Sequence, residues 1–409
     1  MTLRYISPSR IRQPCAALRS CVMPPNIDLL ILGGGCAGLS LAMQLARFDK
    51  RIPKTLILEQ RARYENDRTW CFWGDEKTPF AALATNQWRA VSVAKSDQAV
   101  RVECAVSPYR MLASEHFYSA AAAALSKTSK IQLQMDSQIL SEPQFKDGRW
   151  HFQTSNGVLS SAMVVDTRPA AQVANDAALM WQSFFGQEIE CLQPVFDPGC
   201  AELMSFSSAS PDRVAFTYVL PISSTRALVE FTVFAVKPQS AQALSADLTA
   251  AIEQRVKGAV FAVLRSEQGV LSMGLAPAIT ALGEHDNAST YVRVGLFAGA
   301  ARPATGYAFQ RIQRWAAHCA ARIAGGGPPV VHAKDPWLLA RMDRLFLSVL
   351  QRQPQLAPQM FVDLFSRVDS QRVIRFLSDQ ARHSDYAAIV LALPFRPFLR
   401  QLFCPSSWQ

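Results

Sequence analysis

The chain has 409 residues, 49% of them hydrophobic and only 18% charged, so it folds around a large core and is not disordered. Its net charge of +10 suits an anionic membrane surface, whereas nucleic acid is disfavoured because no basic block with interleaved aromatic residues occurs. No apolar run reaches the roughly 18–20 residues that span a bilayer, and the nine cysteines form no C-x-x-C pair, as in reduced cytoplasmic proteins.

Residues 1–25 carry four arginines and no acidic residue. A secretory signal would need a continuous apolar centre, which this segment lacks. We therefore predict a disordered tail, with a targeting tail or a start of translation at Met23 as alternatives.

A buried strand over Ile27–Leu32 is predicted to run without a polar break into a glycine-rich turn and then into a helix. The turn follows the pattern G-x-G-x-x-G, with its glycines at Gly33, Gly35 and Gly38. The first permits a tight turn, the second lets the backbone approach a pyrophosphate, and the third lets helix and strand pack closely. Because the free N–H groups and the positive dipole end of the helix face the phosphates, this stretch predicts a dinucleotide site.

A second predicted strand, Lys54–Leu58, ends at Glu59. An acidic side chain at this spacing from the glycines typically meets the adenosine ribose of the dinucleotide. Arg61 and Arg63 follow, which leaves recognition of a 2′-phosphate open.

An aromatic cluster ends the polar loop that comes next, and its members are Trp70, Phe72 and Trp73. Two interpretations are open: the cluster belongs to the ordinary core, or it forms a wall of a ligand cavity beside the nucleotide loop.

A helix is predicted from Ser107, as its N-cap, with Pro108 in the first turn, to Leu125. Three strands are predicted after it, over Lys130–Met135, Arg149–Thr154 and Met163–Val165. The last strand ends at Asp166, at a point where chain and cofactor meet a second time in many flavoproteins.

The middle third changes to the pattern of an antiparallel sheet. Two strands rich in β-branched and aromatic residues, Val214–Leu220 and Ala227–Val236, are joined by a turn of hairpin character.

Glu230 is a lone carboxylate in the second of these strands, and alternation places it on one face with Leu228, Thr232 and Phe234. An edge position pointing to water is one interpretation. Neither face offers a polar stripe, however, which favours a buried or cavity-facing Glu230. Burial raises the pKa of a carboxyl group and keeps its proton on at neutral pH, the state that a general acid needs.

A further glycine turn is predicted after a strand over Tyr291–Phe297 and before a basic helix around Arg311–Ala321. Such a turn would contact the flavin end of a dinucleotide through backbone N–H groups. Many flavin hydroxylases carry Gly-Asp here, whereas this chain has Gly299 followed by Ala300, which counts against a hydroxylase.

Beyond a glycine- and proline-rich linker at residues 325–329, the chain is predicted to be helical. Helices are expected at Asp343–Leu350, Pro358–Phe365 and Arg372–Leu377. The apolar segment Tyr386–Phe403 is interrupted by Arg396 and Arg400. It is predicted either to pack on the body as a helix or to lie in a membrane interface with its arginines at headgroup level.

In their order, these motifs resemble those of the flavin-dependent lycopene cyclases of carotenoid synthesis, over nearly everything from residue 26 onward. The most specific are the strand Leu228–Thr232, which bears Glu230, and the turn Pro303–Tyr307. The others are the glycine turn, Arg68–Phe72, Pro108-Tyr109, Asp166–Pro169, Tyr218–Pro221 and Phe376-Leu377. One departure is Ser205, which stands where many relatives carry an aspartate. Ser205 cannot ionise, so a second acid to support Glu230 is missing there, which leaves ring type and rate open.

The resemblance implies an α/β fold, with a Rossmann-like FAD-binding domain, an inserted antiparallel β substrate domain and a helical C-terminal segment. The FAD-binding domain would comprise residues 26–170 and 280–325, the substrate-binding domain residues 171–279, and the helical region residues 330–409.

The resemblance also implies an enzyme, a lycopene cyclase. Its reaction would be a redox-neutral, acid-catalysed cyclisation of the acyclic ends of lycopene to ionone rings, as in β-carotene or γ-carotene. Glu230 would be the catalytic carboxylate, reduced FAD would stabilise the carbocation, and NAD(P)H would be the reductant. FAD would contact Gly33, Gly35, Gly38, Glu59, Asp166, Gly299, Thr305 and Gly306. The polyene would contact Trp70, Phe72, Trp73, Tyr218 and Tyr307.

The expected partners are thus lycopene or a related acyclic carotenoid and a membrane surface, without nucleic acid and without a metal ion. The expected location is cytoplasmic, with peripheral attachment to the membrane. An FAD-dependent hydroxylase of an apolar substrate and a non-catalytic isoprenoid carrier on the same fold are the alternatives.

Overall fold

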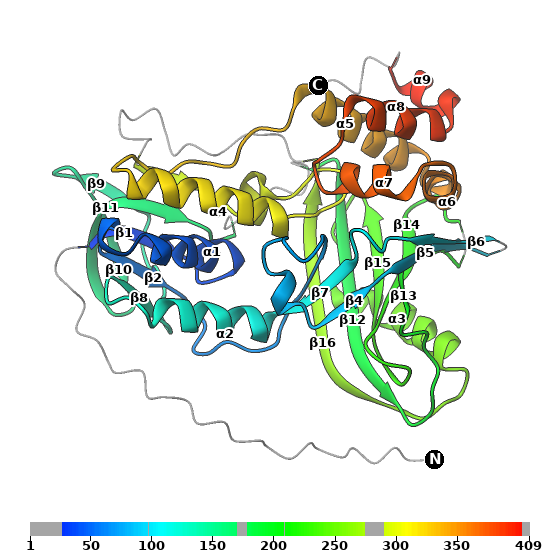
Figure 1. Cartoon of the computed structure of the whole chain (residues 1–409), viewed down its shortest axis with the longest axis horizontal. Helices are drawn as coiled ribbons and strands as arrows, with labels where there is room; N and C mark the ends of the chain where they lie inside the picture. The colour runs from blue at the N-terminus through cyan, green and yellow to red at the C-terminus, as the bar shows by residue number, and fades with distance from the viewer. Residues whose placement is uncertain (1–26, 97, 170–177, 208, 275–289, 403–409) are drawn as a thin grey trace.

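The computed structural model describes residues 27–402 except 97, 170–177, 208 and 275–289. Within these residues the chain forms three β-sheets covered by helices (Figure 1). Two of the sheets have seven strands each, and the third has three. The tail predicted at residues 1–25 lies outside the described residues, as does the beginning of the segment 280–325.

The first sheet carries the glycine turn. Its strands run in the order β8-β2-β1-β11-β10-β9, with β17 beside β11. They are β1 (Ile27–Leu32), β2 (Thr55–Leu58), β8 (Ile131–Gln134), β9 (Gln144–Lys146), β10 (Arg149–Thr154), β11 (Gly157–Asp166) and β17 (Tyr291–Arg293). β1 is parallel to both neighbours, and Leu32 lies opposite Leu58 and Asp166. The turn at Gly33, Glu59 and Asp166 therefore share one edge of the sheet.

Helices cover one face of this sheet. They are α1 (Cys36–Leu45), α2 (Ser114–Leu125) and α4 (Phe309–Ala324). Figure 1 shows α1 between α2 and α4, in contact with both. Buried side chains such as Leu41, Phe117 and Trp315 form one hydrophobic core with the strands beneath them. This burial is what fixes the N-terminus of α1 at the strand edge.

The second sheet is antiparallel except between β13 and β5. Its order is β16-β12-β15-β14-β13-β5-β6. The strands are β5 (Ala90–Lys95), β6 (Gln98–Glu103), β12 (Met180–Cys191), β13 (Cys200–Ser205), β14 (Val214–Pro221), β15 (Arg226–Ala235) and β16 (Phe261–Met273). One face packs on α3 (Ala241–Val256) through Leu248 and Ile252. β5 and β6 come from the N-terminal part of the chain, so this part contributes to both large sheets.

The third sheet lies between the two larger ones (Figure 1). Its order is β3-β7-β4, with β3 (Thr69–Trp73), β4 (Asn86–Trp88) and β7 (Tyr109–Ala113). The indole of Trp88 donates a hydrogen bond of 3.0 Å to the carbonyl of Pro221 in β14, which ties this sheet to the second one.

The C-terminal helices gather over one end of the second sheet (Figure 1). They are α5 (Trp337–Arg352), α6 (Ala357–Arg367), α7 (Ser370–Leu377), α8 (His383–Ala392) and α9 (Phe395–Leu402). Leu347, Met360 and Ile374 form a common core with sheet residues such as Phe216 and Phe234. In the part of the chain that the structure describes, no helix combines the length and the apolar character that crossing a membrane requires.

Most predicted elements are confirmed apart from their exact ends. The strands predicted over residues 54–58, 130–135, 149–154, 214–220 and 227–236 correspond to β2, β8, β10, β14 and β15. The strand predicted at 163–165 is the end of the longer β11, and the helices predicted after residue 310 correspond to α4, α5, α6 and α7.

The helix predicted over residues 107–125 was wrong in its first part. Tyr109–Ala113 is the central strand β7, fully buried and paired with β3 on one side and β4 on the other. The N–H of Ser107 bonds to the carbonyl of Cys104, so Ser107 and Pro108 form a turn and not a helix cap. Burial between two partner strands overrides the local signal of the Ser-Pro pair.

Two other predicted elements are shorter than expected. The strand predicted over Tyr291–Phe297 ends at Arg293, because Gly295, with φ of +98°, turns the chain. The segment predicted at 386–403 as one helix is divided into α8 and α9, since Pro394 forces the preceding residue into an extended conformation.

Candidate functional site

A cavity of about 1210 Å³ extends from the edge of the first sheet to the face of the second. The glycine turn, Glu59 and Asp166 line one end, and Glu230 with its neighbours on β14 and β15 lines the other. Pockets for single small ligands typically hold roughly 300–1,000 Å³. This cavity is therefore larger than a typical pocket for one small ligand and joins the two ends of the site.

The glycine turn has the geometry that the motif requires. Gly33 has φ of +97°, and a Cβ on Gly38 would lie 2.0 Å from the carbonyl oxygen of Gly33. A Cβ on Gly35 would meet nothing within 4 Å, so the backbone there faces open space. The turn thus presents free N–H groups at the start of α1 with the clearance that a pyrophosphate needs.

Glu59 is buried and held against this turn. Its Oε2 accepts a hydrogen bond of 2.8 Å from the N–H of Gly34, and its Oε1 accepts one of 3.0 Å from Nε of Arg61. Burial would raise the pKa of this carboxyl group, but the hydrogen bonds from Arg61 and Gly34 lower it below its usual value. Glu59 is therefore a fixed carboxylate at the edge of the cavity.

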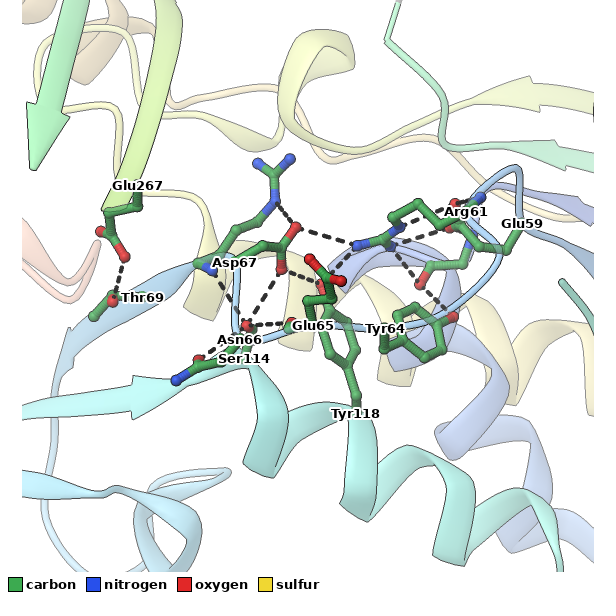
Figure 2. Close-up of polar contacts among 12 residues, drawn as sticks. Glu59, Arg61, Tyr64, Glu65, Asn66, Asp67, Thr69, Ser114, Tyr118 and Glu267 are labelled. Carbon is green, nitrogen blue, oxygen red and sulfur yellow. Dashed lines mark hydrogen bonds and ion pairs between the residues drawn. The ribbon is translucent and has the colours of Figure 1, made fainter. Parts of the chain in front are cut away.

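Arg61 ties Glu59 to the loop and helix around it, as Figure 2 shows. Its guanidinium also donates to the hydroxyl of Tyr118 at 3.1 Å and to Asp67 at 3.3 Å. Its Cζ lies 4.9 Å from the ring centroid of Tyr64. The other arginine, Arg63, pairs with an exposed glutamate and does not line the cavity, so the cationic group near Glu59 is that of Arg61.

Asp166 lies at the end of β11 on the same edge. Its carboxylate accepts hydrogen bonds of 2.8 Å from Nη2 of Arg168 and 2.8 Å from the hydroxyl of Tyr291. Burial would raise its pKa, and the contacts to Arg168 and Tyr291 more than offset that effect, so the pKa lies below its usual value.

The turn Pro303–Tyr307, which precedes α4 and is called the second turn below, contributes Thr305, Gly306 and Tyr307 to the cavity wall. Gly306 has φ of +69°, and its N–H bonds to the carbonyl of Arg302 at 2.9 Å. Gly299, with φ of +95°, lies beside His332 and is not part of the wall.

Glu230 lies on the opposite wall, in β15. Its side chain is 8% exposed, and Leu228, Thr232 and Phe234 line the cavity beside it, as alternation predicted. Burial raises the pKa of Glu230 to about 8, and the charge of Glu267 raises it further. The hydroxyl of Thr232 donates a 2.7 Å hydrogen bond to Oε1 of Glu230, which lowers the pKa in part. The prediction of a buried, cavity-facing Glu230 is confirmed.

Aromatic and aliphatic side chains surround this carboxyl group. Tyr218 lies opposite Glu230 in the register of β14 and β15, and its hydroxyl is 2.9 Å from that of Tyr109. Burial raises the pKa of both phenols well above the usual value, so they stay uncharged. The apolar part of the wall comprises Phe184, Leu203, Phe216, Leu271, Phe361, Leu364 and Phe365. This end of the cavity suits an apolar ligand.

One residue of the aromatic cluster in β3 lines the cavity, and the other two belong to the core. Trp70 lines the cavity, whereas Phe72 and Trp73 are 3% and 5% exposed and belong to the hydrophobic cores. Alternation along β3 turns Trp70 and Phe72 to one side, where both stack on Phe309 of α4, but only Trp70 also reaches the cavity.

Sequence reasoning missed Thr69 and Glu267, which also line this part of the cavity, and Arg265, which contacts both of them. The available signal was alternation in the segment around residues 263–271, which puts Arg265 and Glu267 on the same face of the strand. Ser205, where a second acid was considered, does not line the cavity. Among the described residues no cluster of histidine, cysteine or acidic side chains suits a metal ion.

Comparison with solved structures shows the fold. The chain is similar to the flavin-dependent brominase Bmp2, with a TM-score of 0.60 and 13% sequence identity, over 92% of this chain and 99% of that one. The fold class expected from the sequence, an α/β flavoprotein fold with an antiparallel β portion and a helical C-terminal region, is confirmed.

Comparison with known sequences shows the family. The chain is 28% identical over 396 residues to the lycopene beta-cyclase of Paracoccus sp. (strain N81106 / MBIC 01143), covering 92% of this chain and 96% of the relative. It is 28% identical over 289 residues to the lycopene beta-cyclase of Pseudescherichia vulneris, covering 68% of this chain and 70% of the relative. The family model described as lycopene cyclase protein matches residues 28–403, so the chain belongs to the lycopene cyclase family.

Proposed function

We propose that this protein is a lycopene cyclase that closes the acyclic ends of lycopene into ionone rings without net electron transfer. The observation that carries the proposal is Glu230, a carboxyl group with a pKa of about 8 on the wall of a cavity that also reaches the glycine turn. Such a group holds its proton at neutral pH and can deliver it to an alkene. The two lycopene beta-cyclases among its relatives support the substrate class.

The residues at the edge of the first sheet fit FAD. The open space in front of Gly35 suits the pyrophosphate, and the fixed carboxylate of Glu59 suits the ribose. The residues assigned to the cofactor that line the cavity are Gly33, Gly35, Glu59, Asp166, Thr305 and Gly306. Gly38 packs against β1 behind the turn, and Gly299 lies outside the cavity wall. Reduced FAD, with NAD(P)H as the reductant, supplies negative charge that stabilises a nearby cation and is not consumed.

The side chains of the second sheet perform the proton chemistry. Glu230 donates a proton to the terminal alkene, and its carboxylate then accepts the proton that the ring cation loses. The faces of Trp70, Tyr218 and Tyr307 line the cavity and stabilise the cation through their π-systems. The apolar wall excludes water, which would otherwise capture the cation as an alcohol. Phe72 and Trp73 support this wall from the core and do not contact the polyene.

Each part of the fold has a role in this proposal. Residues 26–170 and 280–325 bind FAD and also contribute β5 and β6 to the second sheet and Trp70 and Tyr307 to the polyene end of the cavity. Residues 171–279 bind the polyene, and residues 330–409 cover the cavity and meet the membrane. α8 and α9 support the last point, because Leu391 and Phe395 are 83% and 69% exposed and Arg396 and Arg400 are exposed next to them. An exposed apolar surface with flanking arginines is typical of an interfacial segment.

Incubation of the pure protein with lycopene, FAD and NADPH tests the function. A cyclase gives a product of unchanged mass with new rings, and in D₂O one deuterium is incorporated per ring formed. NADPH is needed only to reduce the flavin and is not consumed with each turnover. A gain of one oxygen would show a hydroxylase, and unchanged lycopene bound to the protein would show a carrier.

A further inference from the structure

A second carboxyl group, Glu267, lies two strands away from Glu230 on the same face of the second sheet. In the register of this sheet, β14, β15, β12 and β16 contribute one residue each to the same row, in the order Tyr218, Glu230, Gly186 and Glu267. Residues in one row project from the same face of a sheet. The two carboxyl groups therefore stand on the cavity face with Gly186 between them, and both line the cavity.

Gly186 leaves the space between the two carboxyl groups free. A Cβ at this position would lie 3.2 Å from Cβ and 3.4 Å from Cγ of Glu230. Any side chain on β12 in this row would thus press on Glu230 and separate it from Glu267. In the neighbouring rows on the same face, by contrast, β12 carries the side chains of Phe184 and Glu188.

Glu267 is held in place by groups outside this row. The Thr69 hydroxyl donates a 2.7 Å hydrogen bond to its Oε2, as Figure 2 shows, and the Arg265 guanidinium pairs with the same oxygen. Arg265 also donates to Thr69 at 2.8 Å and to Glu188 at 2.6 Å, and Glu188 pairs in turn with Arg226. Arg265 lies in the next row on the same face and pairs with Glu188 as well as with Glu267. Glu267 is the charged group that raises the pKa of Glu230, after the larger effect of burial.

The other titratable groups around Glu230 are neutral near pH 8. From β14, β7 and the second turn these are Tyr218, Tyr109 and Tyr307, whose pKa values burial raises. From β3 it is Cys71, whose pKa burial raises to about 12, with small contributions from Glu267 and Glu230. The cation paired with Glu267 is Arg265, and Arg265 is shared with Glu188, so it offsets the charge of Glu267 only in part.

We propose that Glu267 is a positioning residue for the reaction, whose negative charge, fixed opposite Glu230 across Gly186, keeps the proton on Glu230. Glu267 would thus supply the second acid that Ser205 cannot supply. A negative charge on Glu267 disfavours a second one on Glu230 in a poorly solvated site. Arg265 and Thr69 hold the Glu267 side chain in this position through the contacts described above. This proposal rests on the proposed function only for its effect on cyclisation.

Infrared difference spectroscopy as a function of pH tests the proposal without the reaction. The carbonyl band of protonated Glu230 is the band that Glu230→Gln removes. We expect this band to titrate near pH 8 in the wild-type protein as purified and about one pH unit lower in Glu267→Gln, where the like charge is gone. Titration of the band at the same pH in Glu267→Gln and wild type would overturn the proposal. So would a wild-type band that titrates at the usual pH of a glutamate, a result that needs no folded variant.

Glu267→Asp separates charge from shape. It keeps the negative charge and a partner for Arg265, so we expect the Glu230 band to return toward its wild-type titration. A Glu267→Asp titration that follows Glu267→Gln would show that shape and not charge matters, and would contradict the proposal.

The pH dependence of lycopene cyclisation is the second readout. We expect the alkaline loss of activity to move to lower pH in Glu267→Gln by the same amount as the infrared band. If wild type forms no rings but the band shifts as expected, the proposed function fails and the pairing stands. If rings form but the alkaline limb is unchanged in Glu267→Gln, the pairing fails and the function stands.

Discussion

The proton of Glu230 is held by the residue's surroundings and not by the glutamate itself. The side chain is 8% exposed, faces an apolar wall and accepts a single hydrogen bond from Thr232 among the contacts of the described residues. Glu59 and Asp166, at the other end of the same cavity, are also buried, but each has an arginine partner. Burial without a cation raises the pKa of a carboxyl group, and burial with one lowers it. One cavity thus holds an acid at one end and carboxylates at the other.

Replacement of Glu230 by glutamine should stop the reaction and leave the cofactor in place. Glutamine keeps the shape and the contact with Thr232 but cannot donate a proton, so we expect a loss of at least about 10²-fold in turnover of lycopene. Flavin absorbance should match that of the wild type. Glu202→Gln is the control, because Glu202 lies in the same sheet, pairs with Arg255 and does not line the cavity. Cyclisation by Glu230→Gln at the wild-type rate would remove Glu230 from the mechanism.

The rate should depend on pH in the direction that an acid requires. Because the pKa of Glu230 is raised from 4.5 to about 8, the proton is present below about pH 8 and is lost above it. We therefore expect turnover to fall as the pH rises through about 8. The folded protein also binds more protons than the unfolded chain between these two values, so this group's contribution to the free energy of unfolding declines from about pH 4.5 to about pH 8. Urea unfolding of wild type and Glu230→Gln over this range measures the difference, and equal slopes would contradict the assignment.

At the scale of elements, the turn between β1 and α1 packs against β1 on one side and borders the cavity on the other. Gly38 is in contact with β1, whereas Gly35 faces the cavity, and apart from its own neighbours in the chain nothing lies within 4 Å of the place that a Cβ would take there. Substitution at Gly38 therefore disturbs the fold, and substitution at Gly35 disturbs only what occupies the cavity.

Gly35→Ala and Gly35→Val provide a graded test of FAD binding. Both variants should fold, since a Cβ at residue 35 meets no atom within 4 Å. We expect flavin affinity to fall with alanine and to be abolished with valine, because the added atoms occupy the place of the pyrophosphate. Circular dichroism and flavin absorbance give the two readouts. Stoichiometric flavin in a folded Gly35→Val protein would show that the cofactor lies elsewhere.

The second turn is tied to the C-terminal helices by a buried ion pair. Nε and Nη2 of Arg302 donate to the two carboxylate oxygens of Asp343 in α5 at 3.0 and 2.9 Å, and both side chains are almost fully buried. Arg302 also donates to the carbonyl of Phe376 in α7. The turn that carries Thr305 and Gly306 is thereby fixed to the cover of the cavity.

Asp343→Ala should destabilise the protein strongly, because it leaves a buried guanidinium without its partner. We expect a loss of about 3–5 kcal/mol in the free energy of unfolding. The matched control is Asp247→Ala, which breaks the half-exposed pair with Arg213 and should cost about 0–1 kcal/mol. Denaturant unfolding measures both, and similar small losses in the two variants would show that the pair does not secure the turn.

At the scale of the whole molecule, the apolar and basic surface of α8 and α9 lies on the helices that cover the cavity end of the second sheet (Figure 1). A polyene dissolved in a bilayer reaches a buried acid without crossing water only if the protein meets the membrane. The basic net charge of +10 adds attraction to anionic lipid.

Flotation with anionic liposomes tests this orientation. We expect wild-type protein to float with the vesicles and to float less at high salt, since charges in water are screened over about 8 Å at physiological ionic strength. Leu391→Asp combined with Phe395→Asp should reduce flotation further. Leu192→Asp is the control, because Leu192 is 79% exposed at the end of β12, outside the C-terminal helices. Equal recovery of wild type in the soluble fraction with and without liposomes would refute membrane association.

The sequence by itself determined the features that depend on neighbouring residues. The strand, glycine turn and helix at residues 27–45 follow from an apolar run and three glycine spacings, which act over a few residues. The placement of Glu230 on the cavity face follows from the two-residue period of a strand. The linker at 325–329 and the helices after it likewise follow from local composition and period.

Only the tertiary structure decided what stands next to Glu230. Thr69 and Glu267 are 198 residues apart in sequence and form a hydrogen bond. Gly186 on β12 lies between Glu230 and Glu267, whose strands both pair with β12 but not with each other. The same holds for β7, which became a strand because two partners enclose it, and for Phe72, which α4 covers. Local patterns fix the direction of a side chain along its own element. The pairing of distant strands and the packing of helices depend on the free energy of the whole fold, which no local pattern records.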